Sequence, residues 1–406
     1  MTHDLTDLHT IARTVFDAGV AAADPYQAVA QALAAAPVAD GTPLVAVGKA
    51  AMRMAAAARA QFAPGPTIIV TNPENARDVD GAEVFAADHP VPNAIGLDAG
   101  LAVERLLQAA NREVLVLVSG GGSALLPAPA DGLTLSDKIA VNELLLASGA
   151  DIVDMNLVRQ ALSRLKGGGM LRAAAPARVR ALILSDVVGD DLRAIASGPT
   201  VAPLGTRAEA RAVLERYGLL GRVPAAVHDV LAEEPAQVDV PEAENTLIGS
   251  NAISVMAMAS AARDAGLPVH LHSPALTGDV EDAARRVAAS TDAGIHLFGG
   301  ETTVQLKGDG KGGRNQELAL RVALYLERER GAWVYLQGGT DGRDGPTDAA
   351  GGVMDTERMQ TMRRKVDVNA LLANNDAYAA LKAGNGLLMT GATGTNVADL
   401  GVLIRV

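Results

Sequence analysis

The sequence predicts two α/β domains, the first with a mainly parallel sheet and the second with a mixed sheet. Three observations lead to this prediction: a length of 406 residues, an alternation of short apolar runs with longer helical patterns, and an acidic, proline-containing stretch near the middle. A chain of this length exceeds what one ordinary hydrophobic core holds. We interpret the stretch 231–244 (LAEEPAQVDVPEAE) as the linker, which gives domains at 1–235 and 236–406.

The first half alternates buried strands with helices, and alternation of this kind is typical of a parallel sheet covered on both faces. In the predicted helix Asp154–Lys166, Leu157, Ala161 and Leu165 share one face, and Gly167, a residue type that often ends a helix, follows it. The predicted strands are Leu44–Val47, Thr67–Thr71, Val114–Val118 and Ala181–Ser185, and the predicted helices are Ala50–Phe62, Leu97–Ala110, Leu135–Ala147 and Asp154–Lys166.

The second half continues the α/β pattern. Only three residues separate the predicted strands Ile295–Phe298 and Thr302–Leu306, too few for a parallel crossover, so this sheet is predicted to be mixed. A long helix is predicted at Arg314–Arg330. The other predicted strands are Thr246–Gly249, Val269–His272, Val334–Leu336, Leu387–Thr390 and Val402–Val406.

The composition argues against several classes of function. A net charge of −12 disfavours a nucleic-acid partner, because such binding needs a basic face. The absence of cysteine excludes disulfides, thiolate catalysis and Cys-ligated zinc. No apolar run approaches the roughly 20 residues of a membrane span, and the first 20 residues lack a signal-peptide pattern. We expect a cytoplasmic protein without membrane partners, and the sequence leaves a homodimer open.

Glycine-rich loops follow several predicted strands. Ligands of open α/β sheets bind at the carboxyl ends of strands, where glycine backbone N–H groups can approach an anion. Lys49 follows Gly48 at the end of the first strand, and a turn with a solvated lysine is the alternative to a functional role. After the predicted strand Val114–Val118, we predict a loop whose backbone N–H groups bind phosphate, with a flexible turn as the alternative. The loop comprises Ser119, Gly120, Gly121, Gly122 and Ser123.

Three cations, Arg159, Arg164 and Lys166, lie near the end of the predicted helix Asp154–Lys166, and Gly167 follows them. Lys166 and Gly167 are candidates for contact with the cofactor. Phosphate binding and ordinary complementation of the helix dipole explain this pattern equally well. The segment 185–191 (SDVVGDD) follows a strand and holds three carboxylates. Because Mg²⁺ is usually held by one or two carboxylates plus substrate oxygens, we predict Asp190 as a metal ligand, with a capped loop as the alternative.

In the second half, the segment 338–348 (GGTDGRDGPTD) combines glycines with three carboxylates. We predict Asp341 as a Mg²⁺ ligand or as the base, and Gly339 and Thr340 as contacts to the cofactor. The loop 390–396 (TGATGTN) follows another strand and adds Thr393 and Asn396 to the cofactor candidates.

The loop before the long helix matches G-x-G-x-x-G at positions 308, 310 and 313. The match alone is weak, and the basic character of the loop suits phosphate recognition better than a dinucleotide. Arg314 at the start of the helix is either a fork for phosphoryl oxygens or an exposed helix residue.

Eight segments, in order and spanning nearly the whole chain, resemble the glycerate 2-kinases of the GckA/TtuD type, whose C-terminal half is the MOFRL domain. They are VSGGGSALLPAP (118–129), NLVRQALSRLKGGG (156–169), LILSDVVGDDLRAIASGPT (182–200), IGSN (248–251), GGRNQELAL (312–320), GGTDGRDGPTDAAGG (338–352), NND-Y (374–378) and TGATGTNVADL (390–400). The sequence departs from the family after SGPT, where the family often has Pro-Asp and this chain has Val201-Ala202.

The resemblance implies two dissimilar three-layer α/β/α domains, a Rossmann-like one at 1–235 and a MOFRL-type one at 236–406, with the site in the cleft between them. It implies ATP, Mg²⁺ and D-glycerate as reactants and 2-phosphoglycerate as product. By position, Lys49 and Arg314 are the cations expected at the reacting groups, and the loop 119–123 is expected to hold phosphate.

Two alternatives stay open from the sequence. Some members of this family carry the name hydroxypyruvate reductase, an activity that needs a dinucleotide fingerprint after a strand and an acid about 20 residues later. A non-catalytic protein that binds a phosphorylated acid is the other alternative. The carboxylate-rich loops disfavour it, because negative charge beside a phosphate weakens binding unless a metal intervenes.

Overall fold

The computed structural model describes residues 4–233, 240–273 and 275–406, and the chain divides into two compact units. The first-sheet unit is Pro25–Ile248, and the second-sheet unit combines Met1–Asp24 with Gly249–Val406. The predicted boundary at 235/236 and part of the predicted linker lie outside the described residues. The units differ from the predicted domains at both ends of the first: residues before Pro25 belong with the second sheet, and a strand after residue 236 belongs with the first.

The sheet of the first-sheet unit has six strands in the order β3-β2-β1-β4-β5-β6, and β1 to β5 pair in parallel. The strands are β1 (Leu44–Val47), β2 (Thr67–Thr71), β3 (Glu83–Ala86), β4 (Glu113–Val118), β5 (Arg178–Leu184) and β6 (Glu244–Gly249). The sequence analysis did not predict β3, whose four residues are exposed or only partly buried and therefore form no apolar run. The strand predicted at Thr246–Gly249 is present, but it was assigned to the second domain, whereas it is β6 at the edge of the first sheet, beside β5.

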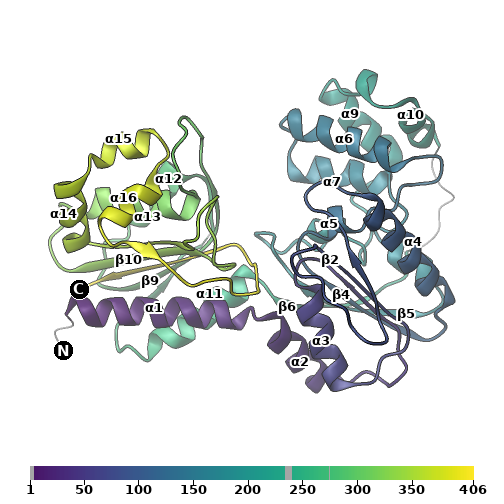
Figure 1. Cartoon of the computed structure of the whole chain (residues 1–406), viewed down its shortest axis with the longest axis horizontal. Helices are drawn as coiled ribbons and strands as arrows, with labels where there is room; N and C mark the ends of the chain where they lie inside the picture. The colour runs from purple at the N-terminus through teal and green to yellow at the C-terminus, as the bar shows by residue number, and fades with distance from the viewer. Residues whose placement is uncertain (1–3, 234–239, 274) are drawn as a thin grey trace. The chain divides into compact units, whose positions relative to one another are not determined.

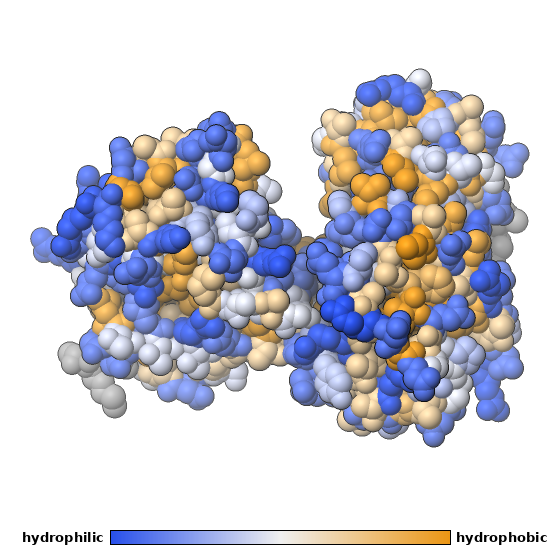
Figure 2. All heavy atoms as spheres, in the orientation of Figure 1, coloured by the Kyte–Doolittle hydropathy of each residue, from blue (hydrophilic) through white to orange (hydrophobic). Residues whose placement is uncertain are grey.

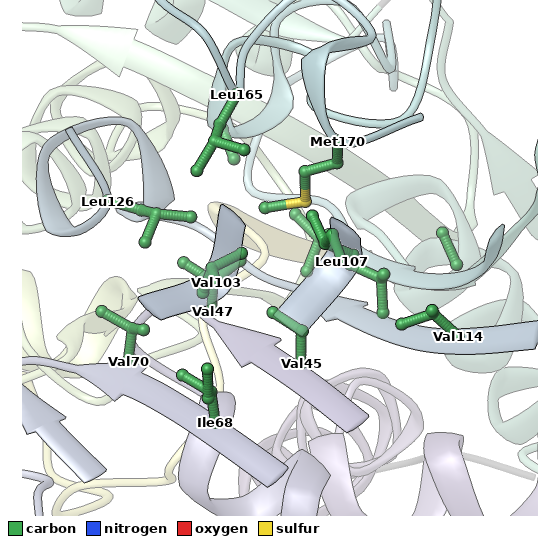
Figure 3. Close-up of a cluster of buried hydrophobic side chains, with 14 of the residues drawn as sticks. Val45, Val47, Ile68, Val70, Val103, Leu107, Val114, Leu126, Leu165 and Met170 are labelled. Carbon is green, nitrogen blue, oxygen red and sulfur yellow. The ribbon is translucent and has the colours of Figure 1, made fainter. Parts of the chain in front are cut away.

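Helices cover both faces of this sheet (Figure 1). The strand residues alternate between the faces, so Val45 and Val47 contact α4 (Ala94–Ala109) and α8 (Gly169–Ala174) in one core. Figure 3 shows Leu165 and Met170 over that face, opposite the valines of β1 and β2. The other face carries α2 (Pro25–Ala35) and α3 (Ala51–Gln61).

A separate group of helices completes the unit, at the upper right in Figure 1. It has its own apolar core and consists of α6 (Leu135–Ala147), α7 (Ile152–Ala161), α9 (Arg207–Arg216) and α10 (Ala225–Ala232), with the short helix η2 (Leu220–Arg222). The short helix η1 (Ile195–Ser197) instead contributes Ile195 and Ala196 to the core of the first sheet. The helix predicted to run to Lys166 therefore ends at Ala161, and that part of the prediction is wrong. Ser163 instead forms an antiparallel bridge with Pro129, so tertiary pairing ends the helix before Gly167.

The second-sheet unit has a mixed sheet in the order β12-β11-β10-β13-β9-β7, with β8 also paired to β9. Its strands are β7 (Val269–Leu271), β8 (Leu276–Asp279), β9 (Gly294–Thr303), β10 (Trp333–Gly339), β11 (Gly351–Asp355), β12 (Leu387–Leu388) and β13 (Asp399–Arg405). The predicted mixed sheet is confirmed, but its expected cause is wrong. The two short strands predicted around residue 300 are one strand, β9, and the antiparallel pairs join β13 to β9 and β10.

Two layers of helices enclose this sheet. One face packs against α1 (Leu5–Ala22) and α11 (Asn251–Arg263). The other packs against α12 (Val280–Ala288), α13 (Arg314–Leu326), α14 (Thr356–Lys365), α15 (Val368–Ala373) and α16 (Ala377–Ala383). Phe16 of α1 is fully buried in this core, which explains why the first helix of the chain belongs to the second sheet.

On the face shown in Figure 2, apolar residues are interspersed among hydrophilic ones in both units. Within the described ranges, no helix combines the length and apolarity that crossing a bilayer requires. The predicted architecture of two α/β domains, one parallel and one mixed, is confirmed by these two sheets.

Candidate active site

The order of the first sheet reverses at β1 and β4, which makes their carboxyl ends the expected ligand position of an open α/β sheet. Ser119 after β4 locks the two ends together: its hydroxyl donates to the Val47 carbonyl and accepts from the Ala50 N–H. Gly48 lies at a φ of +123°, and a Cβ there would come within 2.1 Å of Ser119 Oγ. Only glycine allows this approach of the two loops.

Lys49 lies against the loop after β4. Its N–H donates to the Gly120 carbonyl at 2.9 Å, and a Cβ built on Gly121 would lie 3.3 Å from Lys49 Cε and 3.3 Å from the His89 ring. The Lys49 charge reinforces burial in lowering the pKa of His89 below its ordinary value. The lysine side chain therefore runs along the glycine loop, and the His89 ring lies against the same glycine.

Asp186 follows β5 and faces the same loop. A Cβ on Gly120 would lie 2.0 Å from its Oδ2, so the absence of a side chain at 120 makes room for this carboxylate. Burial raises the pKa of Asp186, while the Lys49 charge opposes that rise. The sequence analysis chose Asp190 from this segment, and it missed Asp186. The signal was available, because Asp186 is the carboxylate nearest the strand end.

Asp190 has a backbone φ of +56°, and its buried Oδ1 has no hydrogen-bond partner among the described atoms. An unpartnered buried carboxylate oxygen is costly unless a cation or donor binds it. The described residues contain no group of three or more His, Asp and Glu arranged to hold a metal ion. The unpartnered oxygen of Asp190 is therefore the feature of this segment that suits a cation, and Mg²⁺ usually binds one or two carboxylates together with substrate oxygens and water.

Lys166 is buried, with 4% of its surface exposed, and its Nζ donates to the Ser123 carbonyl at 2.6 Å. The Ser123 hydroxyl lies 2.7 Å from that of Ser197. The Gly167 N–H donates to the Ser197 carbonyl. Lys166 therefore joins the predicted phosphate loop, whereas the Gly167 N–H is engaged in pairing two loops of the protein.

In the second-sheet unit, Arg314 is the first residue of α13 and its guanidinium is held by two carboxylates. Asp399 at the start of β13 accepts from Nε at 2.6 Å and from Nη2 at 3.1 Å, and Glu301 lies 2.9 Å from Nη1. Asn315 also donates to Asp399. Burial lowers the pKa of the Arg314 guanidinium, but the hydrogen bonds and charge of Asp399 outweigh this effect, so the pKa rises above its ordinary value.

Asp344 fixes the start of the same helix. Its carboxylate accepts from the backbone N–H groups of Asn315 and Gln316 at 3.1 and 2.8 Å, which satisfies N–H groups that have no partner inside the helix. Burial raises the pKa of Asp344 to about 6, although these N–H groups oppose the rise. Asp344 thus positions Arg314 through the backbone, and the sequence analysis did not select it.

The predicted loops 338–348 and 390–396 lie together. Thr393 Oγ1 donates to the Thr340 carbonyl at 2.6 Å, and the Thr340 hydroxyl donates to the Ala398 carbonyl and accepts from the Val397 N–H. Asp341 accepts from the Arg343 N–H, and Gly339 is packed against the same turn. Thr340 therefore joins the loops rather than presenting its hydroxyl to a ligand.

Asn396 also acts within its own loop, where its Oδ1 accepts from the Ala398 N–H at 3.2 Å. A hollow of about 340 Å³ lies between the two loops. It is lined by Gly342, Arg343, Thr347, Asp348, Gly391 and Ala392. This hollow brings an arginine and a carboxylate next to the glycines that the sequence analysis had singled out.

The G-x-G-x-x-G match at 308–313 is not built to bind phosphate. Asn375 Oδ1 accepts from the N–H groups of Lys307 and Gly308, and Asn374 Oδ1 accepts from that of Asp309. A Cβ on Gly308 would lie 2.2 Å from Asn374 Oδ1. These glycines allow close packing against the segment 374–376, and the weak dinucleotide match has a structural cause.

Two family models match the chain, Domain of unknown function (DUF4147) at residues 11–232 and MOFRL family at residues 294–399. A protein named glycerate 2-kinase from Pyrococcus horikoshii is 36% identical, across 98% of this chain and 97% of that protein. This chain belongs to the DUF4147–MOFRL family. An Agrobacterium vitis protein of the family, named as a candidate hydroxypyruvate reductase, is 39% identical across 100% of this chain and 96% of that protein.

A solved structure supports the same membership. The crystal structure of glycerate kinase from Thermotoga maritima matches with a TM-score of 0.91 and 37% identity, and the match covers 99% of this chain and 100% of that one. The resemblance noted from eight sequence segments is therefore confirmed, and so is the kinase family to which it pointed.

Within the DUF4147 part, the structure brings Lys49, the loop 119–123 and Lys166 together, and it adds Asp186 and His89. Within the MOFRL part, it links Arg314 to Asp399 and joins the two loops that hold Asp341 and Thr393. The roles predicted for the individual residues stay predictions, because geometry alone assigns no substrate to them.

Proposed function

We propose that this protein is a glycerate 2-kinase, which transfers the γ-phosphoryl group of ATP to the 2-hydroxyl of D-glycerate and gives 2-phosphoglycerate and ADP. The observation that carries the proposal is the arrangement of Lys49, Gly120, Gly121 and Asp186 at the reversal point of the first sheet. It combines a cation, glycines that let Lys49 and Asp186 approach the loop closely, and a carboxylate for a metal ion. The names of two relatives, glycerate 2-kinase and glycerate kinase, point to glycerate as the molecule that accepts the phosphoryl group.

Phosphoryl transfer depends on positioned reactants and on neutralisation of the charge that spreads over the phosphoryl oxygens. We assign Lys49 to that charge in the first-sheet unit, because its side chain runs along the glycine loop. Arg314 is the corresponding cation of the second-sheet unit. The pair of hydrogen bonds from Asp399 holds its guanidinium in a fixed plane, which suits contact with oxygens of a phosphoryl group or a carboxylate.

In the proposed reaction, the 2-hydroxyl oxygen of glycerate forms a bond to the γ-phosphorus while the bond from phosphorus to the β,γ-bridging oxygen breaks. The electron pair of that bond leaves with ADP. The hydroxyl proton passes to a carboxylate, for which we propose Asp341. One of its oxygens accepts the Arg343 N–H, which fixes the orientation of the group.

We assign Asp190 and Asp186 to Mg²⁺, on the basis of the unpartnered oxygen of Asp190 and the position of Asp186 beside the glycine loop. When bound, the ion supplies positive charge to phosphate oxygens. The protein's own part is to hold Asp186 close to Lys49, whose charge favours the ionised form of that carboxylate. We further propose that the protein is cytoplasmic.

The proposal is tested with purified protein, ATP, Mg²⁺ and D-glycerate. ADP formation is expected to require both glycerate and the metal, and enolase alone is expected to consume the product. A product that enolase consumes only after a mutase is added would carry the phosphate on the 3-hydroxyl and would contradict the regiochemistry.

The rival activity is the reduction of hydroxypyruvate, which the name of the Agrobacterium vitis relative suggests. The loop that matches a dinucleotide fingerprint uses its N–H groups on Asn374 and Asn375, which disfavours this activity. NADH oxidation with hydroxypyruvate at a rate comparable to that of a kinase, without ADP release, would overturn the proposed function.

A further inference from the structure

Three cations of the first-sheet unit gather where its helical group meets the loop after β4. Lys138 lies on α6 and donates to the Leu162 carbonyl at 2.9 Å. Arg159 lies on α7 and donates from Nε and Nη2 to Asn142 Oδ1 at 2.9 and 2.6 Å. Lys166 follows α7 and donates to a backbone carbonyl of the loop 119–123. All of these acceptors are uncharged.

None of the three cations forms an ion pair with a carboxylate of the described part of the chain. The neighbouring Arg164 behaves differently, since Glu104 accepts from its Nε at 3.0 Å. Of these four cations, only Arg164 therefore has a carboxylate as its partner among the described residues.

The three groups are close enough to repel one another. Burial lowers the pKa of Lys166 well below its ordinary value, and the charges of Lys138 and Arg159 lower it further. Burial and the charge of Arg159 lower the pKa of Lys138 to about 7. Buried charges without a partner are costly, so proteins rarely keep them unless a ligand supplies the opposite charge.

The cluster also has unused hydrogen-bonding capacity. An ammonium group carries three donors and a guanidinium five, and one acceptor is present for each lysine and one for Arg159. The nearby hydroxyls of Ser123 and Ser197 form a chain that ends on Asn156 Oδ1. These three cations thus lie among uncharged acceptors in the described part of the chain.

We propose that Lys138, Arg159 and Lys166 form the binding site for the polyphosphate of the nucleotide, an inference that rests on the proposed kinase function. Charge decides between the two anionic reactants. The carboxylate of glycerate carries one negative charge, whereas one phosphate group carries up to about two near neutral pH. Three cations match a chain of phosphates, and they exceed what a single carboxylate neutralises.

The test uses inorganic tripolyphosphate as the probe, because it has neither the base nor the acid of the reactants. Binding is measured by calorimetry without metal for the full-length protein and for the variants Lys138→Gln and Arg159→Gln. Each variant is expected to bind tripolyphosphate on the order of tenfold more weakly, as loss of a charge-assisted hydrogen bond implies. Arg211→Gln on α9 removes an equal charge from an exposed ion pair and is expected to bind as the unmodified protein does.

A thermal melt without ligand separates this role from a structural one. Removal of one member of a repelling cluster is expected to leave the melting temperature unchanged or higher, whereas a structural lysine would lower it. Equal tripolyphosphate affinity in all variants would overturn the proposal. So would a loss of D-glycerate binding with unchanged tripolyphosphate binding, which would assign the cluster to the acid. If the protein binds tripolyphosphate but does not phosphorylate glycerate, the proposed function is contradicted, whereas the proposed polyphosphate site is supported.

Discussion

The guanidinium of Arg314 meets the carboxylate of Asp399 through two hydrogen bonds, although 85 residues separate them in the sequence. Asp399 is 3% exposed, whereas Glu301, the second partner of Arg314, is 44% exposed. The buried partner therefore fixes the arginine, and the exposed one contributes little because solvent screens it.

We predict that Asp399→Asn lowers turnover by about ten- to a hundredfold, because a displaced catalytic cation loses its geometry. The matched change Glu301→Gln is expected to alter turnover by less than about threefold. Steady-state kinetics for both variants beside a thermal melt test this, with the loss expected in kcat more than in the KM for glycerate. Equal effects of the two changes would show that Asp399 has no special positioning role.

Charge-preserving exchanges at the two proposed catalytic cations are expected to fail. Lys49→Arg and Arg314→Lys should each lower turnover by on the order of a hundredfold, because a compact ammonium and a planar guanidinium contact phosphoryl oxygens differently. The exposed Lys311 provides the control, since Lys311→Arg should leave turnover unchanged. Near wild-type turnover in either exchange, with an unchanged melt, would remove that residue from the site.

Asp190→Asn is expected to separate metal dependence from stability. The buried Oδ1 of Asp190 has no partner, so removal of the charge should leave the melting temperature unchanged or raise it. Asparagine tolerates the left-handed backbone found there. The Mg²⁺ concentration for half-maximal activity is expected to rise at least about tenfold, as loss of a charged ligand implies. Asp191→Asn, which removes a carboxylate already paired with Arg193, should leave that concentration unchanged.

Stability is expected to fall in acid because of a histidine pair at the edge of the second sheet. His272 Nε2 lies 2.9 Å from His296 Nδ1, and burial followed by neighbouring histidine charges lowers the pKa of His272 below 6.5. Burial also lowers that of His296. Because the pKa values of these histidines are lower in the folded protein than in the unfolded chain, the unfolded chain binds protons first as the pH falls. The stabilisation is therefore complete above about pH 6.5 and is lost as the pH falls through the folded values.

Urea unfolding between about pH 5 and 7.5 tests the histidine pair. His272→Gln is expected to flatten the decrease in unfolding free energy on the acid side. His228→Gln on α10 should leave the decrease as steep as in the unmodified protein. A profile that is equally steep for all three proteins would contradict this assignment.

Polyphosphate affinity is expected to fall as the pH rises above about 7. In the free protein, burial and Arg159 lower the pKa of Lys138 from 10.5 to about 7, so the ammonium loses its proton in this range, and an anion can then bind only with proton uptake. Lys138→Arg keeps its charge and should flatten the dependence. Calorimetry with tripolyphosphate at several pH values measures it, and parallel curves for the two proteins would rule out a titrating Lys138.

Much of the first-sheet site could be predicted from the sequence. The apolar runs define β1 and β4, and the glycines after them mark the loops that meet at Lys49. Local patterns suffice there because the carboxyl ends of parallel strands meet at one edge of a sheet. Asp186 was missed although it is the carboxylate nearest the end of β5, because its closeness to Gly120 depends on the pairing of β4 with β5.

By itself, the sequence determined the alternation of strands and helices, the division into a parallel and a mixed sheet, and the family, because apolar periodicity and short motifs are local properties of the chain. The tertiary structure alone decided that α1 packs on the second sheet, that β6 belongs to the first, and that Asp399 holds Arg314. It also decided that Lys138 and Arg159 share their surroundings with Lys166. These contacts join residues far apart in sequence, and burial and strand pairing across the fold select them, which no local pattern encodes.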